Sequence, residues 1–262
     1  MATFSANLSM LFQEFPFEQR FEQASASGFD YVECLFPYSL PIETLQQTLE
    51  KHQLEFSLFN APAGEWEQGE RGFAAIAEYQ ERFQQSIAKA LDYAVGLECR
   101  KVHVMAGSLP EGSELSFSDE IFIDNIRYAA DLFAEHQIDV LIEPLNRRDN
   151  PHYYLCDFHK AVALIEQINR NNVKLQFDIY HAQIVHGDVT KLYERYMNYV
   201  GHIQTASVPH RNEPNSGELN DNYLFSLIDN NGYQGQIGCE YRPASTTQAG
   251  LAWLNHYNNT QK

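Results

Sequence analysis

Short apolar runs alternate along the chain with longer segments in which apolar residues recur at helical spacing. The short runs are rich in β-branched and aromatic residues, which is typical of strands. They predict eight strands, at Phe4–Met10, Tyr31–Phe36, Glu55–Asn60, Lys101–Met105, Val140–Asn146, Val173–Ile179, His202–Ser207 and Gln236–Tyr241. The pattern therefore alternates between strand and helix along nearly the whole chain.

Three of the intervening segments, 78–96, 118–136 and 157–169, show a clear helical period. In each, apolar residues recur three or four positions apart and so fall on one face of a helix. The residues on these predicted buried faces are Phe83, Ile87, Leu91 and Ala94, then Ile126, Ala130 and Phe133, then Phe158, Val162, Ile165 and Ile168. Gly28 and Gly96 precede the second and fourth strands, where they indicate helix ends.

Strands that alternate with helices predict a parallel sheet. Eight such units fit the 262 residues of the chain, because a (β/α)₈ barrel needs about 250 residues. We therefore expect an α/β fold, a single TIM-barrel domain over residues 1–262. The alternative is an open doubly wound sheet, but a dinucleotide-binding version needs glycines after the first strand, and SANLSMLFQEF there contains none.

The charge of the chain narrows the classes of partner. With 18 basic and 35 acidic residues the formal net charge is −17, which disfavours a nucleic-acid partner because such binding depends on Lys and Arg at phosphates. We find neither a secretory signal nor an apolar run of membrane-spanning length, so we expect a cytoplasmic protein without a membrane partner. Four scattered cysteines without a C-x-x-C pair predict reduced thiols. The sequence does not decide between a monomer and a homo-oligomer.

Four polar residues at predicted strand ends suggest a metal site. They are Glu143, Asp178, Gln204 and Glu240, near the ends of the fifth to eighth strands. Strands of a barrel are buried on both faces, so polar residues there are exceptions. Three converging carboxylates would repel one another unless a cation lay among them. An oxygen-rich set suits Mg²⁺ or Mn²⁺ better than Zn²⁺. The alternative is that each acid is a separate, hydrogen-bonded structural residue.

Two polar segments after predicted strands would lie on the face of a barrel where active sites form. These segments are 61–72 and 209–217, and the alternative is that both are variable surface loops. The candidate substrate-binding residues are Asn60, Glu70, Arg71, His210 and Arg211, with Arg242 a further candidate for a substrate carboxylate. His181 is a candidate for binding a substrate oxygen or orienting a ligand. Glu33 is the one acid of the second strand, where a single hydrogen-bonded structural acid is the alternative to a functional residue.

Several short motifs together resemble the hydroxypyruvate isomerases of the xylose-isomerase-like barrel superfamily. They are SANLSMLF, NAPAGEWEQGERG, LIEPLN, FDIYH, HIQ, PHRNEP and GCEYRP, and the resemblance runs from about Phe4 to Trp253. It implies that Glu143, Asp178, Gln204 and Glu240 bind one divalent metal ion and that Glu143 and Glu240 are the acid–base pair. Related ketose epimerases typically have histidine at the position of Gln204.

The resemblance implies an isomerase that converts hydroxypyruvate, a small sugar acid, to 2-hydroxy-3-oxopropanoate through an enediolate. A 2-oxo-tetronate isomerase or a ketose 3-epimerase would use the same site, and a sugar-acid binder without catalysis is a further alternative. An apurinic endonuclease of the superfamily needs several zinc ions with many histidine ligands and a basic face, which the sequence disfavours. Ser207 stands where an acidic residue is expected, and PNSGELN departs from the usual loop, although Gly217 and Glu218 are kept.

Overall fold

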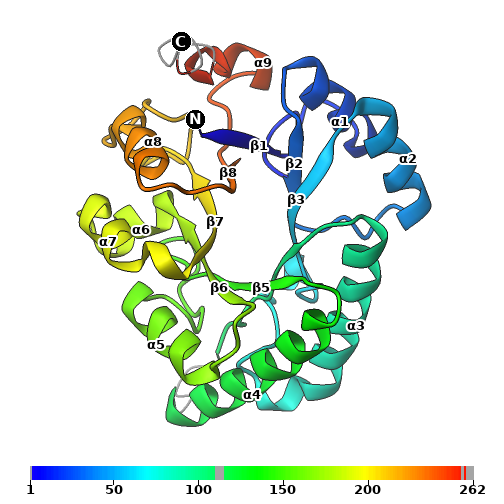
Figure 1. Ribbon diagram of the computed structural model, residues 1–262, viewed down its shortest axis with the longest axis vertical. Coiled ribbons are helices and arrows are strands. Elements are labelled where there is room, and N and C mark those ends of the chain that lie inside the picture. The colour runs from blue at the N-terminus through cyan, green and yellow to red at the C-terminus, as the bar shows by residue number, and fades with distance from the viewer. Residues whose placement is uncertain (1, 110–114, 255–256, 258–262) are drawn as a thin grey trace. The chain divides into compact units, whose positions relative to one another are not determined.

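Eight strands follow one another around a closed barrel in chain order, from β1 to β8, in a computed structural model that describes residues 2–109, 115–254 and 257. The strands are β1 (Thr3–Asn7), β2 (Tyr31–Cys34), β3 (Glu55–Asn60), β4 (Lys101–His103), β5 (Asp139–Ile142), β6 (Val173–Asp178), β7 (Val200–Thr205) and β8 (Gln236–Cys239). Helices alternate with them (Figure 1). The predicted TIM-barrel fold is confirmed.

The described helices occupy the segments between strands. The α-helices are α1 (Phe17–Ala26), α2 (Ile42–His52), α3 (Gln80–Gly96), α4 (Leu115–Ala134), α5 (Phe158–Ile168), α6 (Ile179–Val185), α7 (Val189–Tyr196), α8 (Asp221–Asn230) and α9 (Thr247–Gly250). Short 3₁₀ turns are η1 (Trp66–Gln68), η2 (Ala77–Tyr79) and η3 (Met197–Tyr199). The three segments predicted from periodicity correspond to α3, α4 and α5.

All eight predicted strands are present, but most end earlier than predicted. β3 has the predicted bounds, whereas β1 ends at Asn7 instead of Met10. A local turn ends the strand. The side-chain oxygen of Asn7 accepts a hydrogen bond from the backbone N–H of Ser9, and the backbone carbonyl of Asn7 accepts one from the N–H of Met10. Such turns leave the next residues outside the ladder although they remain apolar.

The chain divides into two compact units. The first comprises Met1–Ser57, Asp178–Glu194 and His202–Lys262, and the second comprises Leu58–Phe177 and Arg195–Gly201. In the first unit the ring of Phe4 on β1 makes edge contacts with Phe225 of α8, Trp253 and Tyr257, with ring centroids between 5.0 and 5.4 Å apart. This aromatic cluster packs the C-terminal segment against β1.

In the second unit α3, α4 and α5 lie along the outer side of the strands (Figure 1). The predicted buried faces are confirmed for α4 and α5, where every residue named from the periodicity is buried. On α3 the residues Phe83, Ile87 and Ala94 are buried, whereas Leu91 is half-buried. These apolar stripes hold the helices against the strands.

Within the described residues, no helix is long and apolar enough to cross a membrane. The four cysteines all lie in the described part and form no disulfide there.

Candidate functional site

Four buried polar residues lie at the carboxyl ends of successive strands. Glu143 directly follows β5, Asp178 is the last residue of β6, Gln204 is the penultimate residue of β7, and Glu240 directly follows β8. None is more than 5 % exposed. The structure therefore places all four at the ends of strands, where the apolar pattern of the sequence predicted them.

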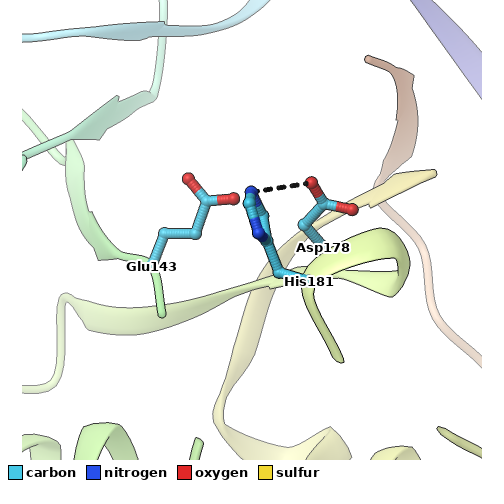
Figure 2. Close-up of side chains that lie close together, drawn as sticks. All are labelled: Glu143, Asp178 and His181. Carbon is cyan, nitrogen blue, oxygen red and sulfur yellow. Dashed lines mark ion pairs between the residues drawn. The ribbon is translucent and has the colours of Figure 1, made fainter. Parts of the chain in front are cut away.

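Glu143 and Asp178 lie close together with His181, a residue of α6. One ligand atom from each of the three side chains can be chosen so that these atoms lie within 4.8 Å of one another, and all three residues are buried. Figure 2 shows the three side chains pointing toward one another. A group of two carboxylates and an imidazole at this spacing could hold a metal ion. Glu240, by contrast, is not a member of this group as far as the described residues show.

Asp178 and Glu240 are joined by the guanidinium of Arg211. Nη2 of Arg211 donates to Oε2 of Glu240 at 2.5 Å and to Oδ2 of Asp178 at 3.4 Å. Burial raises the pKa of Asp178 to about 6 and that of Glu240 to about 8, although Arg211 opposes the rise at both carboxyls. The negative charges of Asp178 and Glu33 further raise the pKa of Glu240. One guanidinium therefore compensates only part of this buried negative charge.

The turn after β7 holds Arg211 in place. Arg211 has a positive φ of 56°, and its backbone N–H donates to the carbonyl of Ser207. Ser207 is buried and its Oγ accepts a hydrogen bond from Ser216 Oγ at 2.9 Å. A side chain at Gly217 would place its Cβ 2.0 Å from the carbonyl oxygen of Val208, so glycine is required there. The unexpected Ser207 and the retained Gly217 thus both serve the turn that presents Arg211.

Glu33 is the centre of a second buried network within the first unit. Its Oε1 accepts from Asn7 Nδ2 at 3.0 Å and from Gln204 Nε2 at 2.7 Å, and its Oε2 lies 2.7 Å from His202 Nε2. Strand register explains the arrangement, because Asn7 lies opposite Glu33 and Gln204 opposite Gly238. The NH₂ group of Gln204 is therefore turned to Glu33.

Glu143 belongs to a hydrogen-bonded group within the second unit. Its Oε2 accepts from Gln176 Nε2 at 3.0 Å and lies 3.6 Å from His103 Nδ1. His103 Nδ1 also lies 3.2 Å from Oδ1 of Asn60. Burial lowers the pKa of His103 to about 3, so the imidazole is neutral, and an Nδ1–H donates to the Asn60 oxygen. Asn60, predicted to bind substrate, is therefore held by His103 next to Glu143.

The apolar pattern of the sequence alone does not distinguish Gln176, His202 or Asn7 as residues of the site. Gln176 precedes Asp178 by two residues and His202 precedes Gln204 by two, and alternate residues of a strand lie on the same face. A search for polar residues two positions before each candidate ligand would have found both. Asn7 would have required the register of β1 with β2.

The predicted loop residues have different environments. Glu70 forms two hydrogen bonds of 2.6 Å with Arg82 and accepts another from the backbone of Glu65. The guanidinium of Arg71 lies over the ring of Trp66, 3.8 Å from its centroid. His210 and Arg242 are exposed. Of the predicted substrate-binding cations, Arg211 is the one that the structure brings to the buried carboxylates.

The donor set fits a divalent cation with a preference for oxygen. Glu143, Asp178 and Glu240 are buried carboxylates, and isolated buried carboxylates are costly unless a cation compensates them. The raised pKa values of Asp178 and Glu240 express that cost. Carboxylate and amide oxygens with at most one histidine suit Mg²⁺ or Mn²⁺ better than a zinc site rich in His and Cys.

Comparison with known proteins gives consistent matches over the whole chain. The sequence profile of a family described as a xylose isomerase-like TIM barrel matches residues 21–257. Hydroxypyruvate isomerase of Escherichia coli (strain K12) is 43 % identical over 98 % of this chain and 100 % of its own. The 2-oxo-tetronate isomerase of Cupriavidus necator is 44 % identical over 98 % of this chain and 99 % of its own. A crystal structure from Brucella melitensis, titled AP endonuclease, family 2, superposes with a TM-score of 0.96 at 47 % identity, covering 98 % of this chain and 99 % of that one.

Proposed function

Because the chain belongs to the xylose isomerase-like TIM barrel family, we propose that it is a metal-dependent isomerase that interconverts the keto and aldehyde forms of a small sugar acid. Hydroxypyruvate and 2-hydroxy-3-oxopropanoate are the leading pair. The observation that supports this proposal most is the set of buried carboxylates Glu143, Asp178 and Glu240 at strand ends, in a chain similar over its full length to two isomerases of small oxo acids.

Glu143, Asp178, Gln204 and Glu240 are the proposed ligands of one divalent ion, Mg²⁺ or Mn²⁺. When bound, the ion supplies Lewis-acid polarisation of the substrate oxygens and stabilises developing negative charge. The proximity of His181 to Glu143 and Asp178 supports a role for it beside this ion, either as a further ligand or as a donor to a substrate oxygen. The amide oxygen of Gln204, whose NH₂ group donates to Glu33, is the atom proposed for the ion.

Glu143 and Glu240 are the proposed acid–base pair. One carboxylate takes a proton from C3 of hydroxypyruvate, which leaves an enediolate, and a proton is then delivered to C2 by the other or by the same residue. The hydroxyl proton of C3 moves to the oxygen at C2, so that the atoms balance between substrate and product. A general acid–base group works best with a pKa near the operating pH. The pKa of Glu240, raised to about 8 by burial, meets this requirement.

Arg211 is the proposed partner of the substrate carboxylate. Its guanidinium is largely buried, lies beside Glu240, and sits 4.8 Å from the ring centroid of Tyr180, so its position is fixed. Planar guanidinium groups bind carboxylates through two parallel hydrogen bonds. Asn60, Glu70, Arg71, His181 and His210 complete the proposed substrate-binding set. Glu70 and Arg71 would act through the shape of the 61–72 loop.

The nearly equal identities to a hydroxypyruvate isomerase and a 2-oxo-tetronate isomerase make 2-oxo-tetronate the second candidate substrate. The endonuclease title of the Brucella melitensis structure raises cleavage of DNA at abasic sites as a rival activity. The net charge of −17 opposes it, because DNA phosphates would meet a strongly negative protein.

The test is proton NMR in D₂O, with hydroxypyruvate and 2-oxo-tetronate offered separately. Each substrate is measured first with Mg²⁺ in the absence of Mn²⁺ and then with excess EDTA. We expect formation of the isomer with incorporation of deuterium, lost in EDTA and restored by added Mg²⁺. Glu240→Gln should remain folded and inactive. Failure of both substrates to convert or exchange, or activity unaffected by EDTA, would refute the proposal. Cleavage of a duplex with an abasic site under the same conditions would establish the rival instead.

A further inference from the structure

We propose that Glu33 is a positioning residue that sets the orientation of the Gln204 amide, so that its oxygen, and not its NH₂ group, faces the metal. The inference rests on the proposed function, because it gives Gln204 the role of a metal ligand. It concerns only residues of the first unit, and it assigns Glu33 no contact with the substrate or the ion.

Three N–H groups converge on the Glu33 carboxylate. They come from Asn7, His202 and Gln204, at distances between 2.7 and 3.0 Å, and all four residues are at most 1 % exposed. An amide can present either its oxygen or its NH₂ group to a neighbour, whereas a carboxylate only accepts hydrogen bonds. Glu33 therefore selects one of the two orientations of Gln204. Such partners of metal ligands fix ligand orientation in many metal sites.

The neighbouring strand is shaped around this carboxylate. Gly238 on β8 lies opposite Gln204 in the register of β7 with β8. A Cβ at position 238 would come within 2.4 Å of both Glu33 carboxylate oxygens. Its φ is not among the positive values, so backbone conformation does not explain the glycine. The absence of a side chain at 238 leaves the room that Glu33 needs to reach Gln204.

The arrangement also restricts which residues can stand at position 204. A glutamate there would bring two carboxylates to about the 2.7 Å that now separates Gln204 Nε2 from Glu33 Oε1. Like charges at that distance oppose each other strongly in a buried site. A residue at 204 must instead donate to Glu33 and offer a lone pair to the cation, which glutamine does and histidine can do. Glu33 thus accounts for a neutral ligand among three carboxylates.

The experiment is a cycle of E33Q, Q204E and the double variant E33Q/Q204E, in which Mn²⁺ binding is measured from the loss of the free-ion EPR signal. In E33Q the acceptor loses its charge and presents an NH₂ group to Gln204 or His202. Hydrogen bonds to charged acceptors are the stronger ones, so we expect Mn²⁺ affinity to fall about 10- to 100-fold. Q204E should also bind more weakly than the unchanged protein.

The double variant separates positioning from mere structural damage. In E33Q/Q204E the new amide at 33 donates to the new carboxylate at 204, so the pair is again complementary and Mn²⁺ affinity should recover at least tenfold over either single variant. Ser57→Ala is the matched control, because it removes a buried hydroxyl bonded to Ser5 and Val32 on the same strands without touching Glu33 or Gln204. Its Mn²⁺ affinity should not change.

Circular dichroism melts in EDTA check that each variant is folded, and E33D is measured as a second single variant. E33D keeps the charge but withdraws the carboxylate, so affinity should again fall. Mn²⁺ affinity of E33Q and E33D equal to that of the unchanged protein, or additive losses in the double variant, would overturn the role of Glu33. If the unchanged protein itself binds no Mn²⁺, the proposed function fails before the cycle begins, which distinguishes the two failures.

Discussion

Removal of the Glu240 carboxyl should change how the stability of the metal-free protein depends on pH. Burial raises the pKa of this carboxyl from 4.5 to about 8. A carboxyl whose pKa is higher in the folded than in the unfolded protein holds more protons in the folded state. Stability from this group is therefore present below about pH 4.5 and is lost as pH rises toward pH 8. Glu240→Gln removes that loss.

The magnitude follows from the two pKa values. Between about pH 6.5 and pH 8.5 the unfolded carboxyl is fully ionised, whereas the folded one passes through its titration. The linkage relation then gives a loss of about 2 kcal/mol of unfolding free energy over this interval in the unchanged protein. His103, whose pKa is lowered to about 3, and Asp178, whose pKa is raised to about 6, titrate mainly below this interval. His103 occurs in both proteins, so its effect cancels in the difference.

The assay is urea unfolding of both proteins in EDTA at several pH values across this interval. The stability of Glu240→Gln relative to the unchanged protein should increase by about 2 kcal/mol from the lowest to the highest pH. Saturating Mn²⁺ should stabilise the unchanged protein more than Glu240→Gln, because the unchanged protein gains binding free energy that the variant lacks. A difference that does not vary with pH in EDTA would refute the raised pKa. Equal stabilisation of both proteins by Mn²⁺ would refute Glu240 as a ligand.

Three further changes test other parts of the structure. Arg211→Met leaves Asp178 and Glu240 without their guanidinium, so the free energy of unfolding in EDTA at neutral pH should fall by about 3 kcal/mol. Turnover should fall by more than 100-fold if Arg211 also binds the substrate carboxylate, and full activity would exclude that role. Gly72→Ala would place a Cβ 2.3 Å from the carbonyl oxygen of Met105, on a backbone with a φ of 98°. Urea unfolding should show that the free energy of unfolding falls by about 3 kcal/mol, and unchanged stability would contradict this packing. Gly238→Ala should weaken Mn²⁺ binding as E33Q does, measured by the same EPR titration, and an unchanged affinity would mean that Glu33 tolerates the methyl group.

The sequence allowed the fold and the strand-end acids to be predicted because both depend on local pattern. Apolar runs and helical stripes gave eight strands and α3 to α5, and the polar exceptions at the ends of those runs gave Glu143, Asp178, Gln204 and Glu240. Strand ends were less accurate, since residues such as Leu8 remain buried and apolar after the ladder stops. The single-domain prediction for residues 1–262 and the cytoplasmic location stay predictions.

Contacts between distant segments were not predictable from one sequence. The pairing of Arg211 with Glu240 depends on a turn at Ser207, and the three donors to Glu33 come from β1 and β7 through strand register. Glu70 and Arg71 show that residue type alone can also suggest a role that the contacts in the structure do not support. Their residue types suit substrate binding, yet the structure engages Glu70 with Arg82 and stacks Arg71 on Trp66. Residue type indicates which chemistry is available, while partners decide how it is used.

Three buried acids of the first unit, Glu33, Asp178 and Glu240, differ in how their charge is compensated, and this difference supports a division of roles. Glu33 receives three N–H groups, and Asp178 receives the backbone N–H of Tyr180 at the start of α6 as well as Arg211. Glu240 relies on Arg211, and the neighbouring Asp178 and Glu33 add to the burial that raises its pKa to about 8, against about 6 for Asp178. A carboxyl that exchanges protons near neutral pH is suited to acid–base catalysis, whereas one that stays ionised is suited to holding a cation. On this ground we propose that Glu240 transfers protons in addition to binding the ion, that Asp178 only binds the ion, and that Glu33 orients a ligand.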